Sequence, residues 1–364
     1  MGTVVRAAPG DAVKIRVLEV LPTLKRAGAE NVALSLASRL DSDRFETGMV
    51  SLYAADPDGL DPRSVHTWYL GKRRGFDPRM WPRLARVFRE FRPDVIHTHS
   101  YLLRYALPVR TCAMVHTIHN LAREETGRLV NRLAFRCGVV PVAVSRRVAD
   151  SFFETYGFQP AATIPNGIEI HSFYRPEVRP LWRRNQGFAE DDVLILSVAR
   201  LDPQKAPETL IEAFAKSCPS AHLLLAGEGS LKEAARQCAQ RCGVAARVHF
   251  LGVRSDVAEM LSSVDVFALA SRWEGRPLAL MEAMAARLPI VATAVGGVPE
   301  LVDDCLVPAG DANALGRALA ALADDPARRR AMGEASGARA QQFSLDKMVA
   351  SYAELFESLV RRTP

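Results

Sequence analysis

Short runs of apolar residues alternate with longer amphipathic stretches along the whole chain. The run KIRVLEVL at 14–21 is typical of a buried strand, and apolar residues recur at helical spacing over 28–40. Further apolar runs of strand length follow up to residue 145, most of them separated by helical stretches. After residue 190 the alternation starts again with DVLILSVA, AHLLLAGEG, RVHFLG, VDVFALAS and PIVATAV. Short strands that alternate with helices predict doubly wound parallel sheets.

Two such series predict an α/β protein with two Rossmann-like domains. The segment IPNGIEI is a turn signal after a strand, and an irregular stretch with two prolines follows it. We therefore place the boundary near residue 168, with a first domain over 1–167 and a second over 168–344. The last helix, over 345–364, has an apolar stripe that needs a partner surface, and we expect it to pack back on the first domain.

The composition is that of a soluble enzyme, with 48% hydrophobic and 24% charged residues. No stretch reaches the roughly 18 apolar residues that a membrane-spanning helix needs. The first twelve residues lack the apolar core of a secretion signal and are expected to form a short leader. The six cysteines include no CxxC pair, which is typical of reduced thiols. These observations predict a cytoplasmic protein.

Positive charge is concentrated in the first half of the chain. Residues 1–165 contain 24 Lys and Arg against 16 Asp and Glu, and the remainder contains 23 against 25. This asymmetry indicates an anionic partner, such as the inner face of a membrane; an arginine-rich surface without such a partner is the alternative. The basic stretch at 71–93 has the composition of a helix for an anionic membrane, but we expect its apolar stripe to pack on the sheet.

Two cations follow the first strand of the second series. Arg200 comes directly after DVLILSVA, and Lys205 follows five residues later. In open α/β sheets the carboxyl ends of the strands border the ligand crevice. Arginine binds phosphate with a bidentate fork and lysine with a point charge. The pair therefore indicates a phosphate-containing ligand.

The stretch SRWEGRPLALMEAMAARLP at 271–289 contains two carboxylates eight residues apart. Glu274 lies just ahead of a predicted helix, where it can accept hydrogen bonds from sugar hydroxyls. Glu282 lies inside an otherwise apolar run, where an unpaired charge is costly, so we expect it to bind a ligand such as a ribose diol. The alternative is that both are surface carboxylates of an amphipathic helix.

That helix is expected to begin at Pro277, which suits a first helical turn, and to end near Arg287. The free amides of Leu278 and Ala279 would favour a diphosphate. The motif GGVPE at 296–300 follows the strand PIVATAV, and its two glycines would permit close backbone approach to a ligand.

Together these motifs resemble the donor half of the family 4 retaining glycosyltransferases, and the similarity continues through IPNGIE, GEG and VAVS. The resemblance implies the GT-B fold, with two Rossmann-like domains whose parallel sheets face each other across a cleft. It implies that the two cations hold the diphosphate of a nucleotide sugar, and that Val253 and Arg254 lie near the nucleobase. The residues that we place at the donor are Gly28, Arg200, Lys205, Val253, Arg254, Gly275, Arg276, Pro277, Leu278, Ala279 and Glu282.

Three histidines lie at strand ends in the first half. His119 matches the active-site histidine of the family, and with Glu274 it forms our predicted catalytic pair. His99 is a candidate for the acceptor side, and His97 is expected to be a satisfied core or rim residue. No carboxylate near these histidines follows metal-ligand spacing, so we predict no metal. The cations and helix amides would then stabilise the leaving diphosphate.

Arg276 departs from the family pattern, which often has Phe or Leu between the glycine and the proline. An added cation here could favour an acidic sugar or a phosphorylated acceptor. The alternative is an exposed arginine with no partner.

The resulting prediction is a metal-independent, retaining glycosyltransferase that uses a nucleotide sugar. We predict a UDP-sugar, with guanine as the alternative base, and a lipid-linked, polysaccharide or small-molecule acceptor; no nucleic acid partner is expected. Alternatives are a sugar-nucleotide 2-epimerase of the same architecture and a non-catalytic nucleotide-sugar-binding protein. A nicotinamide dehydrogenase is less favoured, because HLLLAGEGSLKEA contains only part of a GxGxxG fingerprint.

Overall fold

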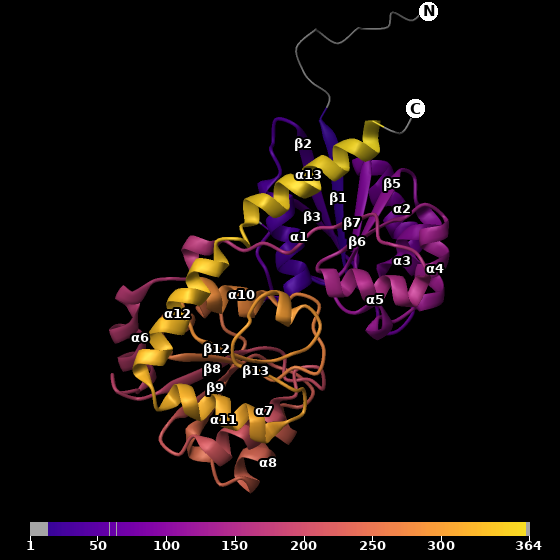
Figure 1. The fold of residues 1–364 in the computed structure, drawn as a ribbon. Helices are drawn as coiled ribbons and strands as arrows, with labels where there is room; N and C mark the ends of the chain where they lie inside the picture. Colours follow the sequence, from indigo (N-terminus) through magenta and orange to yellow (C-terminus); the bar gives the residue numbers. More distant parts are fainter. Residues whose placement is uncertain (1–13, 58, 63, 362–364) are drawn as a thin grey trace, which may run out of the picture. The chain divides into compact units, whose positions relative to one another are not determined.

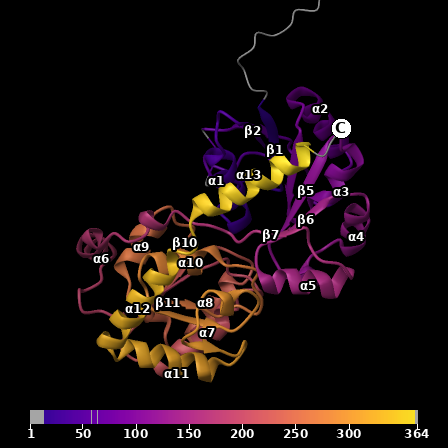
Figure 2. The same ribbon diagram turned by 45° about the horizontal axis from the view of Figure 1, so that its top comes forward.

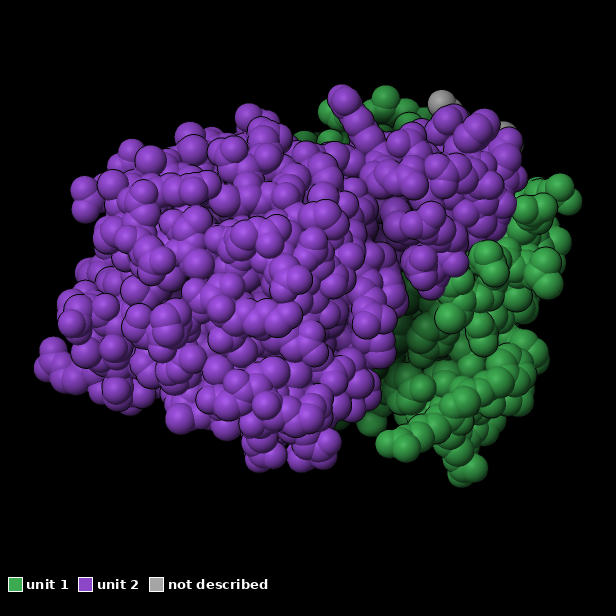
Figure 3. All heavy atoms as spheres, turned by 60° about the horizontal axis from the view of Figure 1, so that its bottom comes forward, with its two compact units in different colours: residues 1–117, 125–142, 349–364 green, residues 118–124, 143–348 purple. Residues whose placement is uncertain are grey.

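The computed structural model describes residues 14–361 except residues 58 and 63, and its ribbon is drawn in Figure 1. The predicted leader and the last three residues of the chain lie outside the described residues. The chain forms two compact units, which Figure 3 shows in different colours. The first comprises the residues up to Thr117, with 125–142 and the residues from Val349 onward; the second comprises 118–124 and 143–348.

A parallel sheet with the strand order β3-β2-β1-β4-β5-β6-β7 forms the centre of the first unit. The pairs that connect β3, β2, β1, β4 and β5 are all parallel. The strands are β1 (Ile15–Leu21), β2 (Phe45–Ser51), β3 (His66–Tyr69), β4 (Val95–His99), β5 (Ala113–Ile118), β6 (Val140–Ala143) and β7 (Ala162–Thr163), of which β7 falls among the residues of the second unit. The helices of this unit are α1 (Gly28–Arg39), α2 (Met80–Phe91), α3 (Leu103–Ala106), α4 (Arg128–Arg136) and most of α13 (Leu345–Arg361).

Helices cover both faces of the first sheet (Figures 1 and 2). On one face, Leu21 and Met49 pack with the alanines of α1. On the other, Leu18 and Phe91 of α2 both approach the position that a side chain at Gly48 would occupy. The apolar residues of α2 are buried, which confirms that the basic stretch at 71–93 packs its apolar stripe inside the unit.

The C-terminal helix α13 packs against strands β4 and β5. The hydroxyl of Tyr352 is 2.8 Å from Oγ1 of Thr117, and the aromatic rings of Tyr352 and Phe356 lie 5.1 and 5.6 Å from the ring of His97. Phe356 is fully buried. The helix α13 thus covers part of the first sheet at β4 and β5, as a helix that connects two strands would.

A second parallel sheet, with the order β10-β9-β8-β11-β12-β13, forms the centre of the second unit. Its strands are β8 (Leu194–Val198), β9 (His222–Ala226), β10 (Val248–Gly252), β11 (Val266–Leu269), β12 (Ile290–Thr293) and β13 (Leu306–Val307). The helices of this unit are α5 (Arg146–Tyr156), α6 (Arg179–Gln186), α7 (Pro207–Ser217), α8 (Lys232–Arg241), α9 (Val257–Ser263), α10 (Leu278–Ala285), α11 (Ala312–Ala323) and α12 (Pro326–Ala340).

The second sheet separates two hydrophobic cores. Residues of α7, α8 and α11 form one core with the side chains on one face of the sheet. Residues of α9 and α10, with the end of α12, form the other core on the opposite face. Figure 1 shows α10 on one side of this sheet and α7, α8 and α11 on the other. The predicted pair of doubly wound parallel sheets is therefore confirmed.

Several predicted elements have nearly the predicted bounds. The predicted strand at 14–21 is β1, and the predicted helix at 28–40 is α1. The domain boundary predicted near residue 168, and the roles given to 1–167 and 168–344, stay predictions. Over the described residues, we find no helix with both the length and the apolar character that membrane crossing requires.

Candidate active site

The carboxyl ends of two adjacent strands carry most of the predicted donor residues. β8 and β11 pair directly in the second sheet, although they are the first and fourth of its strands along the chain. The strand order changes direction here, and ligands of open α/β sheets bind at such a point. The loop after β8 contains Arg200 and Lys205, and the loop after β11 contains Glu274.

A buried ion pair connects these two loops. Nζ of Lys205 lies 2.5 Å from Oε1 of Glu274, and the hydroxyl of Ser271 donates to the same oxygen at 2.5 Å. Thr293 of β12 donates in turn to the carbonyl of Ser271 at 2.6 Å. Only 4% of Glu274 is exposed. Lys205 and Ser271 therefore both donate to Oε1 of this carboxylate, and within the described part of the chain no hydrogen-bond donor contacts Oε2.

Arg200 has a different environment, since 61% of its side chain is exposed. Its guanidinium pairs with Asp202 at 2.9 Å and donates to Oε1 of Gln204 at 3.2 Å. Gln204 also donates to Oδ1 of Asn120, next to His119, and to the carbonyl of Trp273. An accessible cation therefore lies in the same loop as Lys205 of the buried ion pair.

The glycines in this region serve backbone packing within the protein. A Cβ on Gly275 would lie 1.8 Å from the carbonyl oxygen of His119, which places the backbone of this histidine directly against the loop. A Cβ on Gly296 would lie 1.7 Å from the carbonyl oxygen of Glu274, and one on Gly297 would lie 2.1 Å from that of Gly275. We expected the glycines of GGVPE to approach a ligand. In the structure they approach the backbone of the loop that carries Glu274.

The helix α10 begins beside this loop. It spans Leu278–Ala285, and Pro277 precedes it with extended backbone angles, so this proline caps the helix rather than opening its first turn. The difference of one residue is within the usual variation of helix ends. The first amides of the helix, at Leu278 and Ala279, have no partner within the helix. They form the positive end of the helix dipole, as predicted for a diphosphate site.

Glu282 lies on α10 without a protein partner. Within the described ranges, no hydrogen bond or ion pair involves its side chain, which is partly buried. Burial raises the pKa of this carboxyl to about 7. A carboxylate that is neither fully solvated nor paired is costly, and a ligand with hydroxyl donors would remove this cost.

Arg276 is buried, and the alternative that it is an exposed arginine without a partner is therefore wrong. Only 7% of it is exposed, its guanidinium lies 4.9 Å from the centre of the Phe343 ring, and Nη1 is 3.8 Å from Glu300. Burial lowers its pKa, and Glu300 partly offsets this effect. Glu300 also accepts hydrogen bonds from two amides at the start of α5, at 3.2 and 2.8 Å. This arginine belongs to a network around Glu300.

The two residues predicted near the nucleobase follow β10. Val253 is 52% exposed. The guanidinium of Arg254 donates to both oxygens of Asp256, at 2.7 and 2.6 Å, and this bidentate pair lowers the pKa of the aspartate. Trp182 donates to the same carboxylate at 3.1 Å. Arg254 is thus oriented by its neighbour, while Val253 presents an apolar surface.

The remaining predicted residues, Gly28 and His99, belong to the first unit. Gly28 is exposed and begins α1. His99 is fully buried, and its Nε2 lies 2.8 Å from Oε2 of Glu19 in β1. Nδ1 of His97 lies 3.0 Å from the other oxygen of Glu19, and Nε2 of His97 lies 2.8 Å from Thr117. The expectation that His97 is a satisfied core residue is confirmed.

Glu19 is the carboxylate that sequence spacing did not reveal. It comes from a strand about eighty residues earlier in the chain, and with His97 and His99 it could present three ligand atoms to a metal. Burial would raise the pKa of Glu19, but the two histidines lower it below its ordinary value. The carboxylate already accepts from both rings, so hydrogen bonding alone accounts for the cluster.

Sequence reasoning also missed the polar residues that support the site: Asn120, Ser145, Gln204, Ser271 and Glu300. A signal was present for four of these residues, because Ser145 ends the motif VAVS and Glu300 ends the motif GGVPE. Gln204 stands between the predicted cations in ARLDPQK, and Ser271 opens the loop after β11. Their contacts could not be predicted, because the partners are distant in the chain: Ser145 donates to the carbonyl of Gly275, and Asn120 accepts from Gln204.

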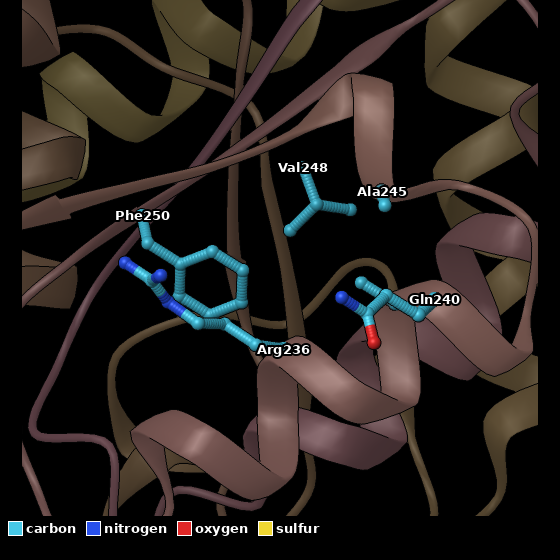
Figure 4. Close-up of a pocket in the computed structure, with 6 residues that line it drawn as sticks. Arg236, Gln240, Ala245, Val248 and Phe250 are labelled. Atoms are coloured by element: carbon cyan, nitrogen blue, oxygen red, sulfur yellow. The ribbon is translucent and has the colours of Figure 1, made fainter.

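One pocket of the second unit lies away from all these residues. It has a volume of about 330 Å³ and is lined by residues of α8 and β10. Figure 4 shows the guanidinium of Arg236 beside the ring of Phe250, and the two lie 5.3 Å apart. None of the predicted donor residues lines this pocket.

Comparisons with known proteins agree with this geometry. Residues 178–339 match the family described as glycosyl transferases group 1, and residues 26–172 match glycosyltransferase family 4. A D-inositol 3-phosphate glycosyltransferase of Kribbella flavida is 31% identical over 293 residues, which cover 69% of this chain and 68% of the relative. An N-acetyl-alpha-D-glucosaminyl L-malate synthase of Bacillus anthracis is 26% identical over 311 residues, 79% of this chain and 80% of the relative.

Among solved structures, HepE of Anabaena in complex with UDP and glucose has a TM-score of 0.83 and 21% identity. The match covers 95% of this chain and all of HepE, and it shows a shared GT-B fold of two Rossmann-like domains. Taken with the family matches over both halves, it means that the chain belongs to the family 4 glycosyltransferases, enzymes that transfer a sugar from a nucleotide sugar to an acceptor.

Proposed function

We propose that the chain is a retaining glycosyltransferase that takes a sugar from a UDP-sugar and transfers it to a lipid-linked or other glycan acceptor. The observation that carries this proposal is the meeting of a cation, a sugar-binding carboxylate and an unpaired carboxylate at one end of the second sheet. Lys205 pairs with Glu274, and α10 begins directly after that loop and presents Glu282. A nucleotide sugar offers a complementary group to each of them.

The donor replaces the contacts that the protein makes without it. The diphosphate takes Lys205 and the exposed Arg200 as counter-ions, and it also accepts from the first amides of α10. The sugar hydroxyls then donate to Glu274, and the ribose diol donates to Glu282. The last of these exchanges gives Glu282 the hydrogen-bond donors that it lacks among the described residues.

The chemical step follows from where the charges lie. The bond between the anomeric carbon and the diphosphate oxygen breaks, and its electron pair leaves with the diphosphate. Arg200, Lys205 and the helix amides stabilise this developing charge. The acceptor oxygen attacks from the same face and its proton goes to the departing phosphate oxygen, so that the anomeric configuration is retained. We assign His119, whose backbone adjoins Gly275, to the sugar side of this reaction.

Several relatives support a diphosphate donor and a lipid-linked acceptor. A relative in Escherichia coli, 26% identical over 346 residues, is a UDP-Gal:alpha-D-GlcNAc-diphosphoundecaprenol alpha-1,3-galactosyltransferase. A relative in Corynebacterium glutamicum, 31% identical over 216 residues, is a GDP-mannose-dependent phosphatidylinositol monomannoside mannosyltransferase. We therefore keep guanine as the alternative base. The first domain, over 1–167, is proposed to choose the acceptor.

A thermal-shift panel of UDP, GDP, ADP and NAD tests the donor assignment. We expect stabilisation by UDP, about 2.7 kcal/mol at a hundred times its dissociation constant, and loss of this effect in Glu282→Gln. Glu233→Gln, at an exposed glutamate of α8, is the matched control and should respond as the wild type does. Stabilisation by NAD alone would overturn the proposal. The product anomer, measured by proton NMR, separates retention from inversion.

A second assay separates transfer from epimerisation. Incubation of the UDP-sugar without any acceptor should leave the sugar configuration unchanged. Conversion of the donor under these conditions would contradict the transferase assignment and favour the 2-epimerase.

A further inference from the structure

Helix α4 (Arg128–Arg136) buries one side and exposes the other. Asn131, Ala134 and Phe135 are buried, and the ring of Phe135 lies 6.1 Å from the ring of His116 in β5. Figures 1 and 2 show this helix at the outside of the first unit, next to α3. The opposite side of the helix faces solvent.

The exposed side carries two leucines one turn apart. Leu129 is 85% exposed and Leu133 is 57% exposed, and residues four apart on a helix lie on the same side. No other large hydrophobic side chain in the described part of the chain is as exposed as Leu129. Single exposed leucines are common at protein surfaces, so the leucines alone carry no argument. The residues around them do.

Three arginines alternate with these leucines on the same side. Arg128, Arg132 and Arg136 are exposed, and α4 contains no carboxylate. Within the described ranges, no carboxylate lies at ion-pair distance from Arg128 or Arg136. We call Arg128, Leu129, Arg132, Leu133 and Arg136 the α4 surface. It combines apolar side chains with a strong positive charge.

Two further arginines extend the charge at both ends of the helix. Nη2 of Arg104 lies 3.2 Å from the position that a Cβ on Gly127 would occupy, just before α4 begins. Arg110 donates to the carbonyl of Cys137, just after α4 ends, at 2.9 Å. The nearest acidic residue of the same unit before the helix is Glu125, and burial raises its pKa to about 8. At neutral pH it therefore offsets little of the positive charge.

Helix α6 contains the same residue types, but two of its arginines form ion pairs within the protein. Its Leu181 is 59% exposed and lies among arginines. There, however, Arg179 and Arg183 pair with Asp265 at 2.8 and 2.7 Å, so their charges are used inside the protein. On α4, by contrast, Arg128 and Arg136 form no ion pair with a carboxylate of the described residues.

We propose that the α4 surface binds an anionic lipid bilayer. Leu129 and Leu133 enter the interface between head groups and acyl chains, and the arginines bind lipid phosphates. The positive charge of the α4 surface favours an anionic partner. Leucines and arginines alternate over one side of the helix, and this pattern fits a bilayer, in which apolar acyl chains lie beneath charged head groups. This inference goes beyond the proposed function, because it concerns where the enzyme works and holds for any donor or acceptor.

Vesicle sedimentation tests the proposal with the full chain. Wild type should sediment with vesicles of phosphatidylcholine mixed with phosphatidylglycerol, and much less with phosphatidylcholine alone or at high salt. A basic residue near an anionic surface contributes roughly fivefold to binding. The double variant Arg128→Gln/Arg136→Gln should therefore bind about 25-fold more weakly. Leu129→Ser/Leu133→Ser should also lose most of the binding.

The control is Leu181→Ser, which removes from α6 a leucine about as exposed as Leu133 and should bind as the wild type does. Unchanged thermal stability and UDP stabilisation of the α4 variants would show that they are folded, since neither alters the proposed donor site. Wild-type binding by both α4 double variants would overturn the proposal. So would a change in oligomeric state, measured by analytical ultracentrifugation, without a change in vesicle binding.

Discussion

Lys205 and Glu274 follow two adjacent strands and form an ion pair of 2.5 Å in which the carboxylate is almost fully buried. The pair keeps two opposite charges close together where a donor would need one near its diphosphate and the other near its sugar. In the proposed function, each side chain exchanges this partner for a group of the donor.

This relationship predicts different effects for the two partners. Lys205→Met should weaken UDP binding and lower kcat/KM by about 10²–10³, because it removes stabilisation of the leaving diphosphate. Glu274→Gln should lower kcat/KM but leave the affinity for UDP, which lacks the sugar, nearly unchanged. Steady-state kinetics and thermal shifts with UDP measure the two quantities. Lys216→Met, at an exposed lysine of α7, is the control. Equal loss of UDP affinity in both variants would contradict these roles.

Glu282 predicts a pH dependence of stability. Its pKa is raised to about 7 in the folded protein by burial. The folded state thus retains a proton that the unfolded state loses, and stability falls as the pH rises from the unfolded pKa, near 4.5, through 7. We expect Glu282→Gln to have a higher Tm than wild type at pH 8, and the difference to shrink towards pH 5. A difference that is the same at both values would refute this account.

Substitution of Gly296 by alanine should destabilise the fold in two ways that can be measured separately, by steric overlap and by an unfavourable backbone conformation. Its φ is +53° and a Cβ there would meet the carbonyl oxygen of Glu274, whereas Gly310, with φ +81°, has nothing within 4 Å. Gly310→Ala should lower the free energy of unfolding by about 1 kcal/mol, which is the cost of an alanine in the left-handed region. Gly296→Ala should lower the free energy of unfolding by about 3 kcal/mol or more, because the overlap of the new Cβ with the carbonyl oxygen of Glu274 adds to that cost. Urea unfolding measures both, and equal losses would show that the loop yields freely.

We expect Arg276 to have no effect on the preference between charged and neutral donor sugars. Its guanidinium lies against Phe343 and Glu300, so its charge is directed into the protein. Arg276→Ala should therefore change the rates with charged and neutral donor sugars by the same factor. A selective loss of activity with acidic sugars would instead assign the arginine to the donor. Unfolding measurements on the same variant would report the cost of leaving Glu300 with its amide donors alone.

The fold could be predicted well from the sequence because each strand and helix is recognised from the residues of one short segment. Each strand is a short apolar run and each helix a periodic one, so β1 and α1 could be placed within a residue. The spacing of Glu274 and Glu282 around a proline likewise placed the carboxylates on both sides of a helix start.

What could not be predicted depends on distant contacts. Glu19 meets His97 and His99 because β1 and β4 are adjacent, which no spacing along the chain reveals. Arg276 was predicted at the donor, with an exposed arginine that has no partner as the alternative. Its burial depends on Phe343 and Glu300, and each lies more than twenty residues away in the sequence. The same holds for the glycines of GGVPE, whose neighbours are backbone atoms of another loop.

The return of α13 to the first unit has a consequence for biosynthesis. The helix supplies Tyr352 and Phe356 to the side of the first sheet that holds His97, and these residues follow the second unit in the chain. The second unit, by contrast, is complete in the chain by Met348. The first unit therefore begins to be synthesised before the second unit, but it can complete its packing only after the whole second unit has been synthesised.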